Sequence, residues 1–135
     1  MPDQPPTLTH VQVLVVEDEA ITRIALTVLL EHQGATVVTA GSVREGLQIL
    51  DRGFQPHVLL SNIRLPDGTG IDVLRHLQHQ DAERQSHTPA IALTGETLST
   101  LQDNPDFAGF QHYLSKPFDS YALVNAIVCL VARSQ

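Results

Sequence analysis

Four groups of polar side chains in this sequence have the types needed to hold a cation beside a phosphoryl group, and each group follows a short apolar run. Adjacent carboxylates repel unless a cation lies between them, and Mg²⁺ favours carboxylate, water and phosphate oxygens. A nearby hydroxyl and ammonium would complete a site for phosphoryl oxygens. Acidic residues after a strand also commonly cap the next helix, so the acidic group alone leaves both interpretations open. The groups are Glu17, Asp18 and Glu19; Ser61 and Asn62; Thr94 and Gly95; and Lys116.

The lysine and the asparagine are the two unusual members of this set. Lys116 is the single lysine among eight basic residues, the others being arginines, which favours a role for its compact ammonium over a role as surface charge. Asn62 lies where a reactive group would be expected, yet a carboxamide is a poor nucleophile. Its place at the junction "LLSNIRLPDGTG" is therefore the main question that the sequence raises.

Strands that alternate with helices would bring the four groups together. A parallel sheet with helices on both faces follows, because right-handed crossovers place the helices there. In such a doubly wound α/β fold, ligands bind at the carboxyl ends of the strands, where all four groups lie. We expect strands over 11–16, 35–40, 57–61, 89–94 and 112–115, and helices from 20 to Gly34, from a Ser42–Glu45 capping box to about 52, from 70 onwards, over about two turns after Gly95, and from Asp119 or Ser120.

Length and composition predict one soluble domain with a short tail. The 135 residues, 42% of them hydrophobic, fit a single domain over 11–135, and the Pro-rich residues 1–10 predict a flexible N-terminal tail. A net charge of −7 argues against direct nucleic acid binding, and no apolar run is long enough to cross a membrane. A single cysteine, Cys129, suits the reducing cytoplasm.

The motifs "LVVEDE", "LLSNIRLPDGTG", "IALTG" and "YLSKPF" together resemble those of the response-regulator receiver domain, the CheY-like module of two-component signalling. The resemblance extends from about Val11 to Val131. It implies a flavodoxin-like fold in which five helices flank a five-stranded parallel sheet of order 2-1-3-4-5. It also implies a signalling protein rather than an enzyme, whose usual form accepts phosphate from a histidine kinase.

The resemblance assigns a metal-binding role to one set of residues. Glu17 and Asp18 match the acidic pair that holds Mg²⁺, and the backbone carbonyl of Arg64 matches a further metal ligand. Asn62 matches the aspartate that is both a metal ligand and the phosphoacceptor. The cofactor implied is therefore Mg²⁺.

A second set matches the residues that respond to the phosphoryl group. Thr94 matches the hydroxyl that moves toward it, Lys116 the lysine that pairs with the site, and Tyr113 the aromatic side chain that swings with the threonine. Pro117 matches the proline that is often preceded by a cis peptide bond.

Asn62 departs from the family's pattern in a way that predicts a chain blind to phosphate. A carboxylate can attack phosphorus and form an acyl phosphate, whereas a neutral amide cannot. Losing one negative charge should also weaken Mg²⁺ binding and turn Lys116 toward Asp18. Ser61 should point to the other side of the strand, and Asp67 should lie too far away to replace the nucleophile. The sequence leaves open whether Asn62 belongs to a degenerate receiver or was introduced into a phosphorylatable one.

Other functions fit the sequence less well. A Mg²⁺-dependent phosphatase on a similar sheet would need a nucleophilic aspartate at residue 62, and a nucleotide-binding domain would need a glycine-rich turn after the first strand.

The expected partners are a sensor histidine kinase or phosphotransfer protein and a downstream effector, with a homodimer left open. His76 and His79 have a spacing that can chelate zinc, although surface histidines are the favoured interpretation. Asn104-Pro105 should shorten or bend the fourth helix.

Overall fold

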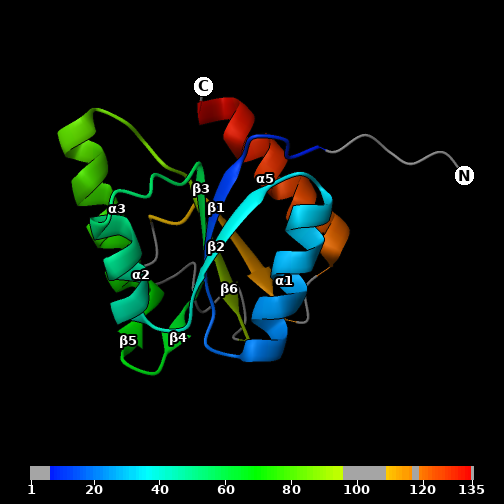
Figure 1. The fold of residues 1–135 in the computed structure, drawn as a ribbon, viewed down its shortest axis with the longest axis horizontal. Helices are drawn as coiled ribbons and strands as arrows, with labels where there is room; N and C mark the ends of the chain where they lie inside the picture. The colour runs from blue at the N-terminus through cyan, green and yellow to red at the C-terminus, as the bar shows by residue number, and fades with distance from the viewer. Residues whose placement is uncertain (1–6, 96–108, 117–118, 135) are drawn as a thin grey trace, which may run out of the picture.

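Strands and helices alternate along the chain in the computed structural model, which describes residues 7–95, 109–116 and 119–134 (Figure 1). The helix expected after Gly95 and the Asn104-Pro105 pair lie outside these residues. The strands are β1 (Gln12–Val16), β2 (Thr36–Ala40), β3 (Val58–Asn62), β4 (Arg64–Leu65), β5 (Gly68–Thr69), β6 (Ala90–Thr94) and β7 (His112–Ser115), and the described helices are α1 (Ala20–His32), α2 (Val43–Asp51), α3 (Gly70–Arg84) and α5 (Ser120–Ser134).

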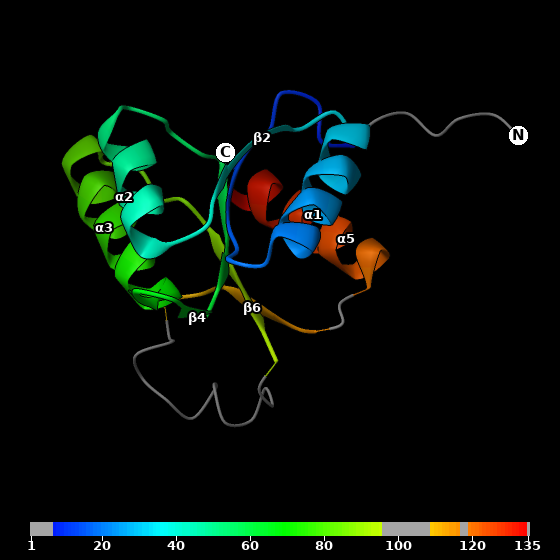
Figure 2. The ribbon, with the colours of Figure 1, turned by 60° about the horizontal axis from the view of Figure 1, so that its bottom comes forward.

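The main sheet confirms the predicted fold class. Its five strands are parallel and follow the order β2-β1-β3-β6-β7, which is the expected 2-1-3-4-5 order once the short β4–β5 hairpin is set aside. Helices α1 and α5 cover one face of the sheet, and α2 and α3 cover the other (Figure 2). The carboxyl ends of β1, β3, β6 and β7 therefore meet at one edge, near the β4–β5 hairpin.

The apolar strand sequences follow from burial on both faces. Along β1, Leu14 and Val16 face the core beneath α2 and α3, while Val13 and Val15 face the core beneath α1 and α5. All five residues of β3 and of β6 are buried. This rigid centre holds the polar residues at the strand ends in fixed positions.

The junction between β3 and α3 depends on a glycine. A Cβ atom on Gly70 would lie 2.3 Å from the carbonyl oxygen of Asn62, so only glycine allows α3 to begin this close to the strand end. The Gly70 N–H donates to the carbonyl of Ile63 at 2.8 Å. Between β3 and α3, where no strand was expected, the chain forms the antiparallel β4–β5 pair.

Residues 7–10 differ from the flexible tail expected over 1–10. Leu8 is fully buried in the core beneath α1 and α5, and its N–H donates to the carbonyl of Gln33 at 2.8 Å. The Thr7 hydroxyl also donates to the Gln33 side chain at 2.8 Å. An apolar residue among polar neighbours was enough to fix this segment, while residues 1–6 lie outside the described part of the chain.

Helix α1 carries two apolar faces and buries only one of them. Leu26 and Leu30 are fully buried, whereas Ile21 is 80% exposed and Ile24 and Val28 are each 62% exposed. The helix expected from residue 20 is confirmed, and Ile21, Ile24 and Val28, which recur at helical spacing, lie on its outward face. Within the described residues, no helix is long and apolar enough to cross a membrane.

Candidate functional site

The carboxyl edge of the sheet brings the predicted residues together around one buried carboxylate. Glu17, directly after β1, is completely buried, and three donors satisfy its side chain. Its Oε2 accepts from the Asn62 Nδ2 at 2.6 Å and from the backbone N–H of Glu19 at 3.0 Å, and its Oε1 accepts from Lys116 Nζ at 2.7 Å. Segments far apart in sequence thus converge as expected from their places at strand ends.

Asn62 lies at the centre of the cluster as a hydrogen-bond donor. Its Nδ2 also donates to Asp18 Oδ1 at 2.9 Å, so the two hydrogens of the amide face both carboxylates. The residue is only 7% exposed. Within the described part of the chain, its Oδ1 is one of two buried side-chain atoms with no hydrogen-bond partner.

Lys116 pairs with Glu17 rather than with Asp18, which corrects the sequence-based expectation. The ammonium is partly exposed, and its carboxylate partner is fully buried. The Lys116 N–H donates to the Thr94 carbonyl at 2.7 Å, which holds the end of β7 beside β6, and the lysine side chain extends from there to Glu17. Because a buried carboxylate needs a counter-charge more than an exposed one does, the pair favours Glu17.

A cavity of about 260 Å³ opens beside this cluster, and its polar lining comes from Asn62, Arg64, Thr94, Gly95 and Lys116. Thr94 is buried at the end of β6, so its hydroxyl is fixed next to the cavity. Arg64 lines the cavity from β4. The metal-binding role of its carbonyl stays a prediction.

Tyr113 lies on β7, partly buried, with its ring centroid 6.2 Å from that of Phe110. Burial raises the pKa of its hydroxyl above the ordinary value of 10.0, so the ring is neutral at physiological pH. Its movement with Thr94 is a prediction that stays open. Pro117, which the family resemblance linked to this site, lies outside the described residues.

Neither neighbouring candidate replaces the missing nucleophile in this arrangement. The buried Ser61 hydroxyl donates to the carbonyl of Asn62 at 2.9 Å, on the side of β3 that faces α3. Asp67 caps α2 instead: its carboxylate accepts from the backbone N–H groups of Val43 at 2.8 Å and Arg44 at 3.0 Å. Both side chains are therefore engaged away from the centre of the cluster.

Three supporting contacts were not foreseen from the sequence. Arg23 on α1 donates from Nη1 to the carbonyl of Glu17 at 2.8 Å, and the Glu19 N–H holds the Glu17 side chain. The third is the Asp67 cap, which ties the hairpin carrying Arg64 to α2. An arginine one turn into a helix that follows an acidic stretch is the signal that could have indicated the first contact.

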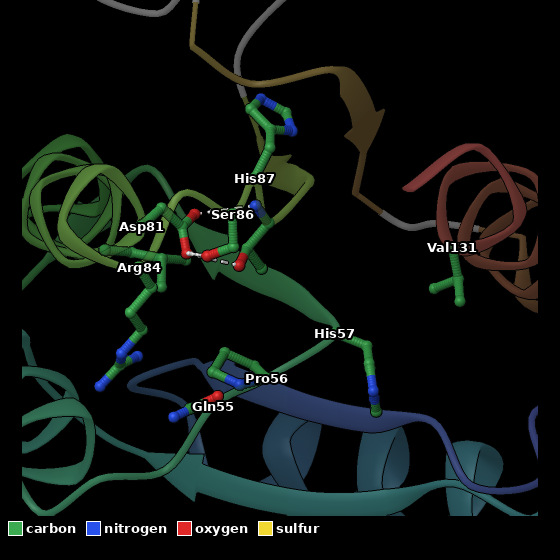
Figure 3. Close-up of a pocket in the computed structure, with 10 residues that line it drawn as sticks. Gln55, Pro56, His57, Asp81, Arg84, Ser86, His87 and Val131 are labelled. Atoms are coloured by element: carbon green, nitrogen blue, oxygen red, sulfur yellow. Dashed lines mark hydrogen bonds between the residues drawn. The ribbon is translucent and has the colours of Figure 1, made fainter. Parts of the chain in front are cut away.

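The opposite edge of the sheet has a hollow of about 220 Å³ with no comparable convergence (Figure 3). His57, Arg84 and His87 line it, but Figure 3 shows their side chains pointing away from one another. The buried carboxylate at this hollow, Asp81 of α3, already accepts hydrogen bonds from Ser86 and Thr88 in the loop that follows the helix. Among the described residues, this hollow therefore lacks a convergent polar cluster like that at the carboxyl edge.

The two histidines with zinc-compatible spacing contact acidic residues separately. His76 Nε2 lies 2.7 Å from Asp51 Oδ1 on α2, and His79 Nε2 lies 3.3 Å from Glu83 one turn along α3. No group of three or more His, Cys, Asp or Glu side chains among the described residues is arranged to hold a metal ion.

The residues at the carboxyl edge do not fit a divalent cation in the arrangement observed. Mg²⁺ needs oxygen ligands at about 2.0–2.1 Å in octahedral geometry. The Glu17 and Asp18 oxygens that would supply them converge on an N–H donor, Asn62 Nδ2, which cannot ligate a metal. The single oxygen of the Asn62 side chain, Oδ1, is buried and has no hydrogen-bond partner among the described residues.

Comparison with known proteins identifies the family to which these features belong. The model of the response regulator receiver domain matches residues 13–128. An uncharacterised 14.6 kDa protein of Leptolyngbya boryana is 31% identical over 121 residues, which is 90% of each chain. The cell cycle transcriptional regulator CtrA of Caulobacter vibrioides is 29% identical over 124 residues, 92% of this chain but only 52% of that protein.

Solved structures give the same family. The receiver domain of the sensor histidine kinase PA1611 from Pseudomonas aeruginosa is 26% identical with a TM-score of 0.77, over 90% of this chain and 97% of that one. That structure is described with a magnesium ion coordinated in its active site cleft, and receiver domains typically bind Mg²⁺.

Proposed function

Because this chain belongs to the response regulator receiver domain family, we propose that it acts in two-component signalling as a protein-interaction module that does not accept a phosphoryl group at residue 62. The observation that carries the proposal is the donor role of Asn62, whose Nδ2 faces Glu17 and Asp18. A phosphoacceptor must instead present an electron pair to the incoming phosphorus atom.

The chemistry at residue 62 supports a block on the usual reaction. In that reaction a carboxylate oxygen forms a bond to phosphorus while the donor's leaving group departs with its electron pair, which gives an acyl phosphate. The amide nitrogen of Asn62 has its lone pair delocalised into the carbonyl, and the oxygen carries no full negative charge. Ser61 and Asp67 are engaged elsewhere, so neither takes over the role of a nucleophile at residue 62.

The rest of the proposal concerns ligands and partners. Mg²⁺ should bind this pocket more weakly than a pocket with aspartate at residue 62, because one negative charge is missing. We assign the chain to the cytoplasm, with a sensor histidine kinase or phosphotransfer protein on one side and an effector protein on the other. The pocket's shape is kept by Glu17, Asp18, Thr94 and Lys116. Tyr113 couples the conformation of the pocket to the neighbouring surface.

Support for a protein partner comes from the outer face of α1. Ile21, Ile24 and Val28 are exposed along a helix that begins two residues after Asp18. A contiguous apolar patch of this kind is typical of a surface that another protein covers. A partner bound there would lie close to the pocket.

Intact mass spectrometry tests the proposal. The chain and its Asn62→Asp variant are incubated with Mg²⁺ and a small-molecule phosphoryl donor, quenched in acid and weighed. Only the aspartate variant should gain roughly 80 Da, the mass of one phosphoryl group. Peptide mapping should verify that residue 62 is still asparagine in the unmodified chain, since a deamidated fraction would carry the acceptor.

Two results would count against the proposal. An adduct on the unsubstituted chain that maps near residue 62 would show that the pocket has another nucleophile. No adduct on the Asn62→Asp variant would show that the pocket had lost its reactivity through more than this residue. The matched control adds Lys116→Met to the Asn62→Asp variant, and this double variant should lose the adduct if Lys116 serves the phosphoryl group as the family resemblance implies.

A further inference from the structure

We propose that the Asn62 carboxamide takes the place of the divalent cation in this pocket, so that Glu17 and Asp18 are held together without a metal ion. The inference rests on the proposed function and deepens it, because it makes the interaction module independent of Mg²⁺ as well as of phosphate. The residue then acts as a built-in counterpart to the acidic pair and is more than an inert replacement for a nucleophile.

The contacts of Nδ2 carry the first step. A primary amide has two N–H donors, and here they reach Glu17 Oε2 at 2.6 Å and Asp18 Oδ1 at 2.9 Å. One partner is fully buried and the other is exposed, so the amide joins the interior of the pocket to its mouth. Hydrogen bonds to ionised carboxylates are among the stronger ones in proteins.

The ammonium of Lys116 completes the same arrangement. Two carboxylates and one ammonium leave a single net negative charge among the four side chains, because Asn62 adds none. The charged partner of Lys116 is the buried Glu17, at 2.7 Å. The acidic pair thus has hydrogen-bond donors and a counter-charge from the chain itself.

A cation that bridged Glu17 and Asp18 through the oxygens now bound to Asn62 would have to displace the amide. Mg²⁺ would have to approach the same two carboxylate oxygens to about 2.0–2.1 Å, a space that the amide nitrogen now fills. The side chain would have to give up both hydrogen bonds or turn over. A turned amide without a cation would place Oδ1 against two carboxylates, which is repulsive.

The buried Oδ1 supports the observed orientation. In the described part of the chain this oxygen lacks a hydrogen-bond partner, which is an unfavourable state for a buried acceptor. In this orientation both amide hydrogens reach Glu17 and Asp18, and the opposite orientation would lose both bonds. An amide that served only as a neutral filler would gain nothing from this choice.

A simpler explanation of weak metal binding would involve the missing charge alone, and an alanine variant separates the two. Asn62→Ala has the same charge as the unsubstituted chain, but its side chain has no hydrogen-bond donors. If charge alone decides, Asn62→Ala should respond to Mg²⁺ as little as the unsubstituted chain. If the amide competes with the cation, removing it should open the space between Glu17 and Asp18 and produce a Mg²⁺ response.

The test measures the melting temperature and Mg²⁺ affinity of the full chain and of its Asn62→Ala and Asn62→Asp variants, at matched ionic strength. We expect Mg²⁺ to shift the unsubstituted chain by no more than about 1 °C. At about ten times its dissociation constant, Mg²⁺ should raise the melting temperature of the aspartate variant by about 4 °C, and that of the alanine variant by a measurable fraction of this. Without metal, the aspartate variant should melt below the unsubstituted chain.

Each outcome decides the matter. Equal responses of the unsubstituted chain and the alanine variant, or a response of the unsubstituted chain as large as that of the aspartate variant, would overturn the inference. Asn62→Val, which is also uncharged and has neither a donor nor an oxygen in its side chain, provides the same comparison if the alanine variant does not fold. A chain that binds Mg²⁺ well yet gains no phosphoryl adduct would overturn this inference and leave the proposed function intact.

Discussion

Asn62, at the end of β3, and Asp81, in the last turn of α3, are similar in shape and similarly buried, yet their surroundings have opposite chemistry. Asn62, 7% exposed, meets two acceptors, the carboxylates of Glu17 and Asp18, with its amide nitrogen. Asp81, 6% exposed, meets three hydrogen-bond donors with its two carboxylate oxygens. Asn62 thus supplies donors to neighbours that are acceptors, and Asp81 supplies acceptors to neighbours that are donors.

The donors around Asp81 come from the loop between α3 and β6. Its Oδ1 accepts from the hydroxyls of Ser86 at 3.1 Å and Thr88 at 3.0 Å, and its Oδ2 accepts from the Thr88 N–H at 2.8 Å, bonds that surround it in Figure 3. Both oxygens are satisfied, whereas Asn62 leaves Oδ1 without a partner among the described residues. The difference separates a side chain that only holds a loop from one in a functional pocket, where full satisfaction gives way to another requirement.

The largest effect should come from removing the satisfied side chain. Asp81→Ala deletes three hydrogen bonds and leaves the Thr88 N–H without its acceptor, so the free energy of unfolding should fall by about 2–4 kcal/mol. Urea denaturation measures the loss. Glu83→Ala, on the exposed side of the same helix, should stay within about 0.5 kcal/mol. If the two variants lose equal stability, Asp81 is not the structural counterpart of Asn62.

A smaller effect should come from exchanging the chemical type while keeping the shape. Asp81→Asn places an amide nitrogen among hydrogen-bond donors, which should cost about 1–2 kcal/mol in the free energy of unfolding. Its mirror image is Asn62→Asp in the absence of metal, which places a third carboxylate beside Glu17 and Asp18. Denaturation of both single variants under metal-free conditions tests the rule. A neutral Asp81→Asn exchange would mean that matching donors to acceptors does not determine the residue at these positions.

The sequence was sufficient to predict which residues meet at the carboxyl edge but not how they bond. Strand ends in a parallel sheet must converge, so Glu17, Asp18, Asn62 and Lys116 could be placed together from the alternation of strands and helices. The partner of Lys116 depended on which carboxylate the fold buries. The donor role of Asn62 depended on which end of its amide faces Glu17 and Asp18. Neither the partner of Lys116 nor the orientation of Asn62 can be predicted from the spacing of residues in the sequence.

Helix α1 shows a second limit of pattern reading. Apolar spacing identified the helix correctly, because Ile21, Ile24 and Val28 recur with its period. The same period is present in the buried residues Leu26 and Leu30, and periodicity alone cannot decide which of two apolar faces packs inward. The burial of Leu8 was missed for a related reason, since a single apolar residue in a polar segment has no period at all.

The smallest effect should come from Asp67, an exposed carboxylate that extends the rule of matched donors to the surface. Hydrogen bonds from the backbone N–H groups of Arg44 and Val43 hold the pKa of Asp67 below its usual value of 3.8. A lowered folded-state pKa contributes stability that is present above pH 3.8 and is lost as the pH falls through the folded value. Asp67→Asn should therefore be less stable than the unsubstituted chain near neutral pH, and the difference in their free energies of unfolding should narrow in acid.

Denaturation at a series of pH values measures this gap in stability, with Glu31→Gln, an exposed substitution on α1, as the control. A gap that is constant across the acid range would show that the charge of Asp67 adds nothing to its cap on α2, so that the rule of matched chemical type applies only where water is excluded.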